Sequence, residues 1–449
     1  MTPAHEPAAF EVRTFGCQMN KHDSERLSGL LMASGMVPAT DTGSADVIVF
    51  NTCCVRENAD ERLRGQVASL KALKGPRGSG PLIAVGGCIG QRDGAALLRD
   101  LPHVDVVFGT HNLEHLPVLI DTAWRTRSAA VEVLDHGESF ASDLPGTREH
   151  PWHAWVPVTV GCDNHCSYCI VPTVRGRERS RAFEDVVGEC ERLVTDGVVE
   201  ITLLGQNVNS YGRDRYGEPR FAELLRTVAG TGVEWLRFTT SHPKDLSADT
   251  ISAMAQTPQV CRYLHLPVQS GSDAVLRAMN RRYTKASYLA LVDRLRQAMP
   301  DLALSTDAIV GFPGETEADF LDTLDVFSMV RFDQAFTFIY SPREGTPAAS
   351  MDEQVPRDVA QERFDRLVEV VQATALERNL PYSGRSERVL VEGASKRDPR
   401  VLAGRTATNK VVHAPVPEGR RAEDLAGTFV TVDVEEAQTW FLAGRMRGE

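Results

Sequence analysis

Long apolar runs are missing from this chain of 449 residues. No stretch approaches the ~20 consecutive apolar residues that a membrane-spanning helix needs. The opening segment, residues 1–10, has neither the cationic region nor the apolar core of a secretory signal peptide. Hydrophobic residues make up 42% and charged residues 24% of the chain, the balance of a soluble globular protein. We therefore expect a cytoplasmic protein.

An excess of basic residues is also missing, because the formal net charge is −12. This balance excludes a global attraction to nucleic acid, although local basic patches can still bind RNA. The nine cysteines are an odd number in a chain without an export signal. In a reducing compartment, such cysteines bind metal or take part in catalysis more often than they form disulfides.

Strand and helix patterns alternate through the first ~145 residues, which predicts an α/β domain with a doubly wound parallel sheet. The expected strands are 10–17, 46–53, 82–88 and 104–110, and the expected helices are 23–34, 58–73 and 94–100. A glycine-rich loop, residues 75–80, precedes the third strand. Three of the strands end on a cysteine, and ligands gather at the carboxyl ends of parallel strands. We therefore expect Cys17, Cys53 and Cys88 to lie close together.

A second series of strands and helices follows a polar linker, residues 136–150. Its expected strands are 155–160, 200–204, 235–240, 263–268, 302–310 and 334–340, and its expected helices are 182–196, 221–228, 283–299, 317–330 and 357–380. Six such units predict a partial (βα)6 barrel, because a complete barrel needs eight. Short β-rich runs then occupy 388–392, 401–405, 410–414 and 428–434 and predict a small antiparallel β-barrel. The expected domains are 9–135, 148–380 and 381–449.

Cys162, Cys166 and Cys169 follow the first strand of the second series, with spacings of three and two intervening residues. Barrel enzymes place their chemistry at the carboxyl ends of the strands. Three thiolates hold three irons of a 4Fe-4S cluster and leave the fourth iron open for another ligand. The alternative is structural zinc, which needs four closed ligands. No second C-x-x-C pair exists, so His165 or another histidine would have to complete that set.

The cysteines of the first domain have two interpretations. A lone cysteine at a strand end is most often part of the core, but three of them favour a second cluster. Cys54 follows Cys53 directly, and side chains alternate along a strand, so one of the two should face away from the site. The residues alone leave open which of the two binds metal.

Several motifs are similar to those of the methylthiotransferase family, which belongs to the radical S-adenosylmethionine superfamily. They span nearly the whole chain and comprise residues 14–20, 51–53, 86–88, 161–181, 204–212, 265–272 and 340–346. The resemblance implies two 4Fe-4S clusters, one held by Cys17, Cys53 and Cys88 and the other by Cys162, Cys166 and Cys169. It selects Cys53 over Cys54, which is then a spare thiol, and places the aromatic ring of Tyr168 near the adenine of S-adenosylmethionine. The last domain resembles the RNA-binding TRAM domain.

The resemblance also implies an activity. The motifs are most similar to those of tRNA-modifying members, which add a methylthio group to carbon 2 of N6-(dimethylallyl)adenosine at position 37, beside the anticodon. S-adenosylmethionine then serves as both methyl donor and radical source, and the partners are tRNA, an electron donor protein and a sulfur source. Two alternatives remain: a methylthiotransferase acting on threonylcarbamoyladenosine or a protein, and a non-catalytic iron-sulfur protein that binds RNA.

Other polar residues are candidates for contacts with the cofactor or with tRNA. Gln206 and Asn207 follow the second barrel strand, and Gln269 and Ser270 follow the fourth; each pair either binds cofactor or forms a polar turn. Arg343 is suited to a phosphate or a carboxylate, or to a surface ion pair. Residues 307–315 form a turn whose glycines serve backbone geometry. The segment 175–181 has four arginines against one glutamate and is either a solvated face or a contact for the RNA backbone.

Overall fold

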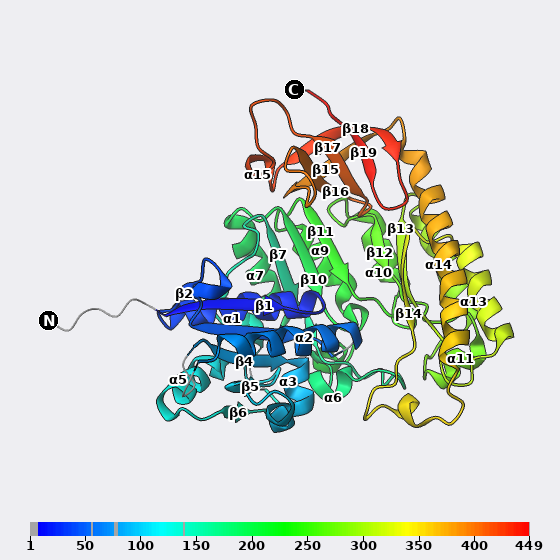
Figure 1. Ribbon diagram of the computed structural model, residues 1–449. Coiled ribbons are helices and arrows are strands. Elements are labelled where there is room, and N and C mark those ends of the chain that lie inside the picture. The colour runs from blue at the N-terminus through cyan, green and yellow to red at the C-terminus, as the bar shows by residue number, and fades with distance from the viewer. Residues whose placement is uncertain (1–7, 55–56, 76–79, 138–139, 449) are drawn as a thin grey trace. The chain divides into compact units, whose positions relative to one another are not determined.

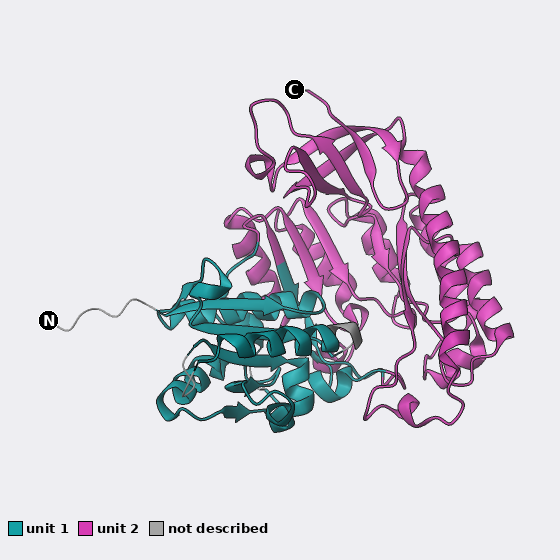
Figure 2. Cartoon of the chain, in the orientation of Figure 1, with its two compact units in different colours: residues 1–149, 155–164, 169–181 teal, residues 150–154, 165–168, 182–449 magenta. Residues whose placement is uncertain are grey.

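The computed structural model describes residues 8–54, 57–75, 80–137 and 140–448, with only the backbone described for 57–59. These residues form two compact units (Figure 2). Unit 1 comprises the described residues up to Glu149, together with Trp155–Asn164 and Cys169–Arg181, and unit 2 comprises His150–Ala154, His165–Tyr168 and the chain from Ala182 onward. Most of the loop expected at 75–80 lies outside the described residues. Every helix in the described part of the chain is too short or too polar to cross a bilayer.

Unit 1 is built on a six-stranded sheet in which every pair of neighbouring strands is parallel. The order is β2-β1-β3-β4-β5-β6, with bounds β1 (Ala9–Thr14), β2 (Val37–Pro38), β3 (Val47–Thr52), β4 (Leu82–Gly87), β5 (Val106–Phe108) and β6 (Ala130–Glu132). All residues of β3 and β4 are buried, as continuous apolar strands covered on both faces should be. The four expected strands are confirmed, and β2 and β6 are short additions that the patterns did not predict.

Helices cover both faces of this sheet. They are α1 (Gln18–Ala33), α2 (Glu57–Ser69), α3 (Cys88–Asp93), α4 (Leu97–Asp100) and α5 (Leu116–Thr126). Alternate residues of β3 enter two separate apolar clusters, Ile48 and Phe50 in one and Val47 and Val49 in the other. This alternation confirms the doubly wound arrangement. The expectation that the first strand reaches residue 17 is wrong, because β1 ends at Thr14. Helix α1 begins at Gln18, earlier than predicted. The sequence pattern missed its first turn because that turn is polar and lacks an apolar period.

The central part contains six strands arranged in two three-stranded sheets, with orders β11-β10-β7 and β12-β13-β14. Their bounds are β7 (His153–Pro157), β10 (Glu200–Leu204), β11 (Trp235–Thr239), β12 (Tyr263–His265), β13 (Ala303–Val310) and β14 (Gln334–Ile339). The larger helices between and after them are α7 (Phe183–Thr195), α9 (Phe221–Ala229), α10 (Ala248–Gln256), α11 (Asp273–Ala278), α12 (Lys285–Ala298), α13 (Glu317–Val330) and α14 (Arg357–Asn379). Contact between β11 and β12 joins the two sheets. The partial (βα)6 architecture is therefore confirmed (Figure 1).

Shorter elements follow the first barrel strand and β10: β8 (Thr159–Val160), α6 (Val171–Arg175), β9 (Arg179–Ser180) and α8 (Arg213–Tyr216). The C-terminal strands form a closed barrel in the order β15-β16-β17-β19-β18. They are β15 (Ser386–Ala394), β16 (Val401–Thr406), β17 (Val411–Pro415), β18 (Phe429–Ala437) and β19 (Leu442–Met446), with α15 (Ala422–Leu425) between β17 and β18. The expected small barrel is confirmed with one correction. It is not wholly antiparallel, because closure pairs β17 with β19 in parallel.

Candidate functional site

Three cysteines of unit 1 lie just beyond the carboxyl ends of three adjacent strands. Cys17 immediately precedes α1, Cys53 follows β3, and Cys88 is the first residue of α3, directly after β4. Because β1, β3 and β4 are neighbouring parallel strands, these positions share one edge of the sheet. The thiol of Cys53 is hydrogen-bonded to Cys17, and Cys17 and Cys88 influence each other electrostatically. The structure therefore brings the three predicted residues together.

Two glycines make this close approach possible. Gly16 has φ +134°, and a Cβ atom there would lie 2.3 Å from Cys53 Cβ. Gly87 has φ +78°, and a Cβ atom there would lie 2.4 Å from Asn51 Oδ1. Any side chain at either position would collide with the neighbouring strand end and strain the backbone. Each glycine beside a cysteine thus serves the packing of the site.

A pair of buried asparagines links the strand ends. Asn20 Nδ2 donates to Asn51 Oδ1 at 3.3 Å and to the Thr52 carbonyl at 3.1 Å. Asn51 Nδ2 donates in return to the Asn20 carbonyl at 2.8 Å and to Ser24 Oγ at 2.9 Å. These bonds tie the first turn of α1 to the end of β3. Asn20 and Asn51 stand within the sequence motifs 14–20 and 51–53, but the motifs alone do not indicate this pairing.

Cys54 does not face away from the site, contrary to the expectation from strand alternation. β3 ends at Thr52, so the alternation no longer applies at residues 53 and 54. The Cys54 thiol is hydrogen-bonded to Cys88. The site therefore contains four thiols rather than three.

The surroundings of these thiols favour two of them as thiolates. The hydrogen bond from Cys53 lowers the pKa of Cys17 to about 6, although burial acts against this and Arg175 adds to it. The hydrogen bond from Cys54 lowers the pKa of Cys88 to about 7, again against burial and with support from Arg175. Thiolate is the form that binds iron. This donor set therefore fits a thiolate-ligated iron-sulfur cluster.

No group of three or more His, Cys, Asp or Glu side chains in the described part of the chain surrounds a single metal ion. A 4Fe-4S cluster does not require such convergence, because each cysteine binds a different iron. All nine cysteines are described, and none of them forms a disulfide.

The second cysteine triplet is distributed over both units. In unit 1, the N–H of Cys162 donates to the Gly176 carbonyl at 3.2 Å, and Asn164 Nδ2 lies 3.4 Å from Cys162 Sγ. Cys169, also in unit 1, is followed after one residue by α6. In unit 2, the buried guanidinium of Arg281 lies 3.4 Å from Cys166 Sγ. Arg281 was missed by the sequence analysis, because nothing in the local pattern distinguishes it from neighbouring Arg282.

Tyr168 lies in unit 2 at the edge of an aromatic cluster. Its ring is 6.5 Å from the ring of Phe312 in an edge-on arrangement, and Phe312 is 5.3 Å from Tyr340. Val275 and Met279 pack into the same cluster. Arg343 lies near this cluster, since its charge acts on the phenol of Tyr340. The cluster provides an apolar wall beside Tyr168 within unit 2.

The loops after β10 and β11 contain buried polar atoms without a hydrogen-bond partner among the described residues. They are Asn207 Oδ1, Asn209 Nδ2 and Ser241 Oγ. Asn207 is held in place, because its Nδ2 donates to Asp245 Oδ2 at 2.7 Å. Gln206, next to it, is partly exposed. Buried polar groups are nearly always paired, so these atoms at the carboxyl ends of barrel strands indicate a ligand site.

The two candidates after β12 have different surroundings. Gln269 is buried with φ +65°, and its backbone pairs with β13 through Asp307 and Ile309. The hydroxyl of Ser270 lies 3.3 Å from Thr323 Oγ1 and accepts from the N–H of Ser272. These bonds give the Ser270 side chain a role in anchoring its own loop to α13.

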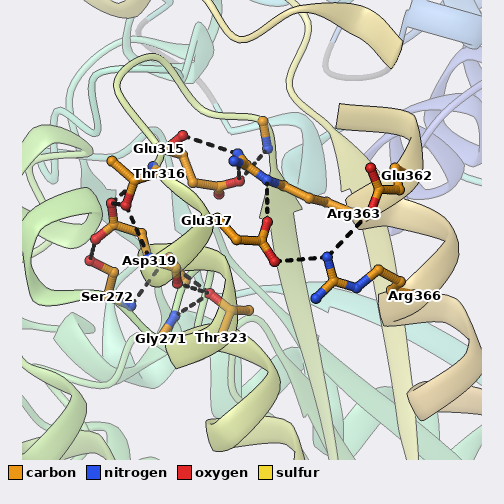
Figure 3. A network of polar contacts seen from close by, with 12 residues as sticks. Gly271, Ser272, Glu315, Thr316, Glu317, Asp319, Thr323, Glu362, Arg363 and Arg366 are labelled. Carbon is orange, nitrogen blue, oxygen red and sulfur yellow. Dashed lines mark hydrogen bonds and ion pairs between the residues drawn. The ribbon is translucent and has the colours of Figure 1, made fainter. Parts of the chain in front are cut away.

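A buried ion pair holds the loop that follows β13 (Figure 3). Arg363 of α14 donates to Glu315 Oε1 at 2.8 Å, and the same oxygen accepts from the N–H of Gly311 at 3.0 Å. Gly311 has φ +71°, and a Cβ atom there would lie 2.6 Å from Ala360 Cβ. The glycine turn expected within 307–315 is therefore a backbone device that packs against α14.

The arginine run 175–181 is not a continuous basic surface. Arg175 and Arg181 are buried, and Arg181 donates to the Pro157 carbonyl at 3.0 Å. Arg179 donates to the Gly137 carbonyl at 2.7 Å. Arg177 is exposed and pairs with Asp163 at 3.0 Å. Burial of Arg175 and Arg181 excludes a solvated face formed by the whole run, and Arg177 and the half-buried Arg179 are its arginines at the surface.

Comparisons with known proteins cover nearly the whole chain. Residues 9–109 match the Uncharacterized protein family UPF0004, residues 156–327 the Radical SAM superfamily and residues 381–446 the TRAM domain. TsrM from Kitasatospora setae, a radical S-adenosylmethionine methyltransferase solved with cobalamin and a 4Fe-4S cluster bound, has the same fold. Its TM-score is 0.52 at 15% sequence identity, over 77% of each chain.

Several similar curated proteins are named tRNA-2-methylthio-N(6)-dimethylallyladenosine synthase. The relative from Acidothermus cellulolyticus is 53% identical over 436 residues, which cover 96% of this chain and 86% of the relative. The relative from Nocardia farcinica is 50% identical over 439 residues, covering 96% of this chain and 87% of the relative. The chain therefore belongs to the family of tRNA-2-methylthio-N(6)-dimethylallyladenosine synthases, within the radical S-adenosylmethionine superfamily.

Proposed function

We propose that this chain is a methylthiotransferase that adds a methylthio group to carbon 2 of N6-(dimethylallyl)adenosine at position 37 of tRNA. The observation that carries the proposal is the identity of about half of all residues, over 96% of the chain, with synthases named for this product. The chain also has the full set of three matched regions, including the TRAM domain. No feature of the described residues favours threonylcarbamoyladenosine as the substrate instead.

The two cysteine triplets have separate roles in this proposal. Cys162, Cys166 and Cys169 hold a 4Fe-4S cluster with one open iron for S-adenosylmethionine, and Cys17, Cys53 and Cys88 hold an auxiliary 4Fe-4S cluster. With S-adenosylmethionine, these centres supply radical generation and the methylthio group, chemistry that belongs to the cofactors. The protein supplies ligation, orientation and exclusion of water. The burial of Cys53, Cys88 and Cys166 is consistent with that division.

The polar atoms after β10 and β11 are suited to the charged end of S-adenosylmethionine. The unpaired Asn207 Oδ1 is an acceptor for its ammonium group, and Asn209 Nδ2 and Ser241 Oγ are donors for its carboxylate. Gln206, Gln269 and Arg343 are further candidates for cofactor contacts. Tyr168, with Phe312 and Tyr340 behind it, provides the wall against the adenine. The hydroxyl of Ser270 has the weaker case, because Thr323 and Ser272 already engage it.

The proposed activity requires three partners. The tRNA anticodon loop presents the target base, and RNA loops with splayed bases suit sequence-specific recognition. An electron donor protein reduces the clusters. A sulfur source replaces the sulfur that leaves with each product.

The test is expression of the chain in a bacterial strain that lacks its own synthase, followed by mass spectrometry of tRNA nucleosides. We expect 2-methylthio-N6-dimethylallyladenosine to reappear. Cys166→Ala should abolish both product and 5′-deoxyadenosine, whereas Cys88→Ala should abolish product and leave 5′-deoxyadenosine formation in the purified protein. A methylthio group found only on threonylcarbamoyladenosine, or a wild-type protein that forms no 5′-deoxyadenosine, would contradict the proposal.

A further inference from the structure

A buried arginine lies at the auxiliary cysteine site, although it belongs to the motif of the other cysteine triplet, residues 161–181. Arg175 is the last residue of α6, and its Nη2 donates to Asp23 Oδ2 at 2.8 Å. Both side chains are only 5% exposed. Separating the pair would leave each charge buried without a partner, which is strongly unfavourable. Burial therefore keeps Arg175 and Asp23 paired.

The position of Arg175 is set by the packing of α6. Ile170 and Val174 enter the same apolar cluster as Cys54 and Cys88. Helix α6 also contacts α3, the helix that begins at Cys88. The carbonyl of Val174 accepts from Thr110 Oγ1 at 2.6 Å. The guanidinium is therefore delivered to the cysteines by a helix that cannot shift without disturbing the core of unit 1.

The charge of Arg175 acts on two of the thiols. Its guanidinium acts electrostatically on Cys88 and on Cys17. Burial raises the pKa of Asp23, but Arg175 and His22 together outweigh burial, so that the pKa stays below its ordinary value and the carboxylate remains charged. Arginine does not lose its proton in proteins. Arg175 thus brings a permanent positive charge to the site, and the carboxylate of Asp23 holds it in place.

We infer that Arg175, held by Asp23, is a positioning residue that raises the reduction potential of the auxiliary cluster through its fixed charge. The inference rests on the proposed assignment of Cys17, Cys53 and Cys88 as ligands of that cluster. Reduction adds one electron to a centre already surrounded by thiolates, and a neighbouring cation stabilises the more negative state. Net charge and hydrogen bonds to the sulfurs are the factors that set such potentials.

The same segment belongs to the Radical SAM match, residues 156–327, and follows Cys169 closely in sequence. The residue that tunes the auxiliary centre is therefore supplied from beside the cysteine motif of the other cluster. A sequence search restricted to the first matched region, residues 9–109, cannot find it.

The test uses the full chain with Cys162, Cys166 and Cys169 changed to Ala, so that the auxiliary cluster is the only centre. After anaerobic reconstitution, iron per chain is measured, and the cluster is titrated with dithionite and redox mediators under EPR detection. Arg175→Gln should lower the midpoint potential by at least 59 mV, which for one electron corresponds to a tenfold change in the reduction equilibrium. Asp23→Asn should shift it upward, because the charge of Arg175 is then uncompensated. Arg177→Gln, which changes an exposed arginine two positions away, should leave it unchanged.

Each outcome decides the inference. Opposite shifts for Arg175→Gln and Asp23→Asn support it, since a merely structural role predicts loss of iron and no such pattern. If Arg175→Gln cannot hold iron, Arg175→Lys decides. An Arg175→Lys protein that keeps both the iron and the midpoint potential of the parent protein supports the inference. If both Arg175 variants lose iron and Asp23→Asn leaves the midpoint potential unshifted, the inference is overturned. Full iron with an unchanged potential in Arg175→Gln also overturns it. A parent protein without iron instead refutes the assignment of the auxiliary ligands, and the inference with it.

Discussion

Cys53 and Cys54 are neighbours in the chain, and both thiols belong to the auxiliary site, but their surroundings differ. The hydrogen bond to Cys88 raises the pKa of Cys54 far above its ordinary value, and burial raises it further. Cys54 is therefore a neutral thiol that donates to the sulfur of Cys88. Cys53 instead donates to Cys17, and the family resemblance selects Cys53 rather than Cys54 as the ligand. A neutral donor tunes a cluster sulfur without binding iron.

Cys54→Ala should therefore keep its iron, whereas Cys53→Ala should lose the auxiliary cluster and with it roughly half of the iron expected for two equal clusters. The small cavity left by Cys54→Ala should cost roughly 1 kcal/mol of stability. Iron per chain after anaerobic reconstitution is the measurement. Equal loss of iron in both variants would show that Cys54 is a ligand.

At the scale of elements, the segment expected as a linker is attached to α1. The N–H groups of Thr147 and Glu149 donate to the carbonyl and to Oε1 of Glu25, each at 3.0 Å. Arg26 Nη1 donates to the Leu144 carbonyl at 3.1 Å. The described end of this segment is therefore part of unit 1 rather than a free connection. Its polar composition gave no sign of this, because backbone groups make most of the bonds.

Glu25 should make this attachment dependent on pH. Burial raises the pKa of Glu25 from 4.5 to about 7. A carboxyl whose pKa is higher in the folded state contributes stability below its unfolded pKa and loses it as the pH rises through the folded pKa. The contribution should therefore decline between pH 4.5 and about 7. Glu25→Gln should flatten this decline and should be more stable than the wild type at pH 8, by on the order of 1 kcal/mol after solvent screening.

Urea unfolding at several pH values measures this effect. The wild-type curve and the Glu25→Gln curve should diverge as the pH rises. Parallel curves would show that the backbone hydrogen bond from Glu149 keeps Glu25 charged in the folded protein.

At the largest scale, buried charges join the C-terminal barrel to the (βα)6 part within unit 2. Asp333 accepts from Lys410 Nζ at 2.7 Å and from Arg378 Nε at 3.2 Å. Arg237 donates to Glu200 Oε2 at 2.6 Å and to the Thr406 carbonyl at 2.9 Å. The side chains of Lys410 and Asp333 are 7% and 5% exposed, so water does not screen this pair. At this interface, each buried charge is therefore stabilised by a buried partner of opposite charge.

Lys410→Met should destabilise the protein by about 2 kcal/mol, because Asp333 is left buried with Arg378 as its remaining cation. Arg388→Met is the matched control: Arg388 and Glu234 also join the two parts, but both are about half exposed. An exposed pair contributes at most about 1 kcal/mol. Urea unfolding compares the two variants, and an equal effect would contradict the importance of burial.

The sequence alone predicted most of the architecture and both cysteine triplets. The patterns of apolar residues defined β10 and α13 to the residue, because such patterns are local properties. The cysteines at strand ends predicted a shared site, since the carboxyl ends of parallel strands meet at one edge. Family motifs then selected the chemistry.

Other properties depend on contacts between distant residues. Arg175 and Asp23 are 152 positions apart, so their pairing could not be predicted from either neighbourhood. Arg175 is buried beside thiols while Arg177 faces solvent, although the two stand in the same run. The parallel pairing of β17 and β19 followed from closure of the barrel. The sequence thus determined the elements and the chemical groups, and only the tertiary structure decided which charges lose their water and therefore act on one another.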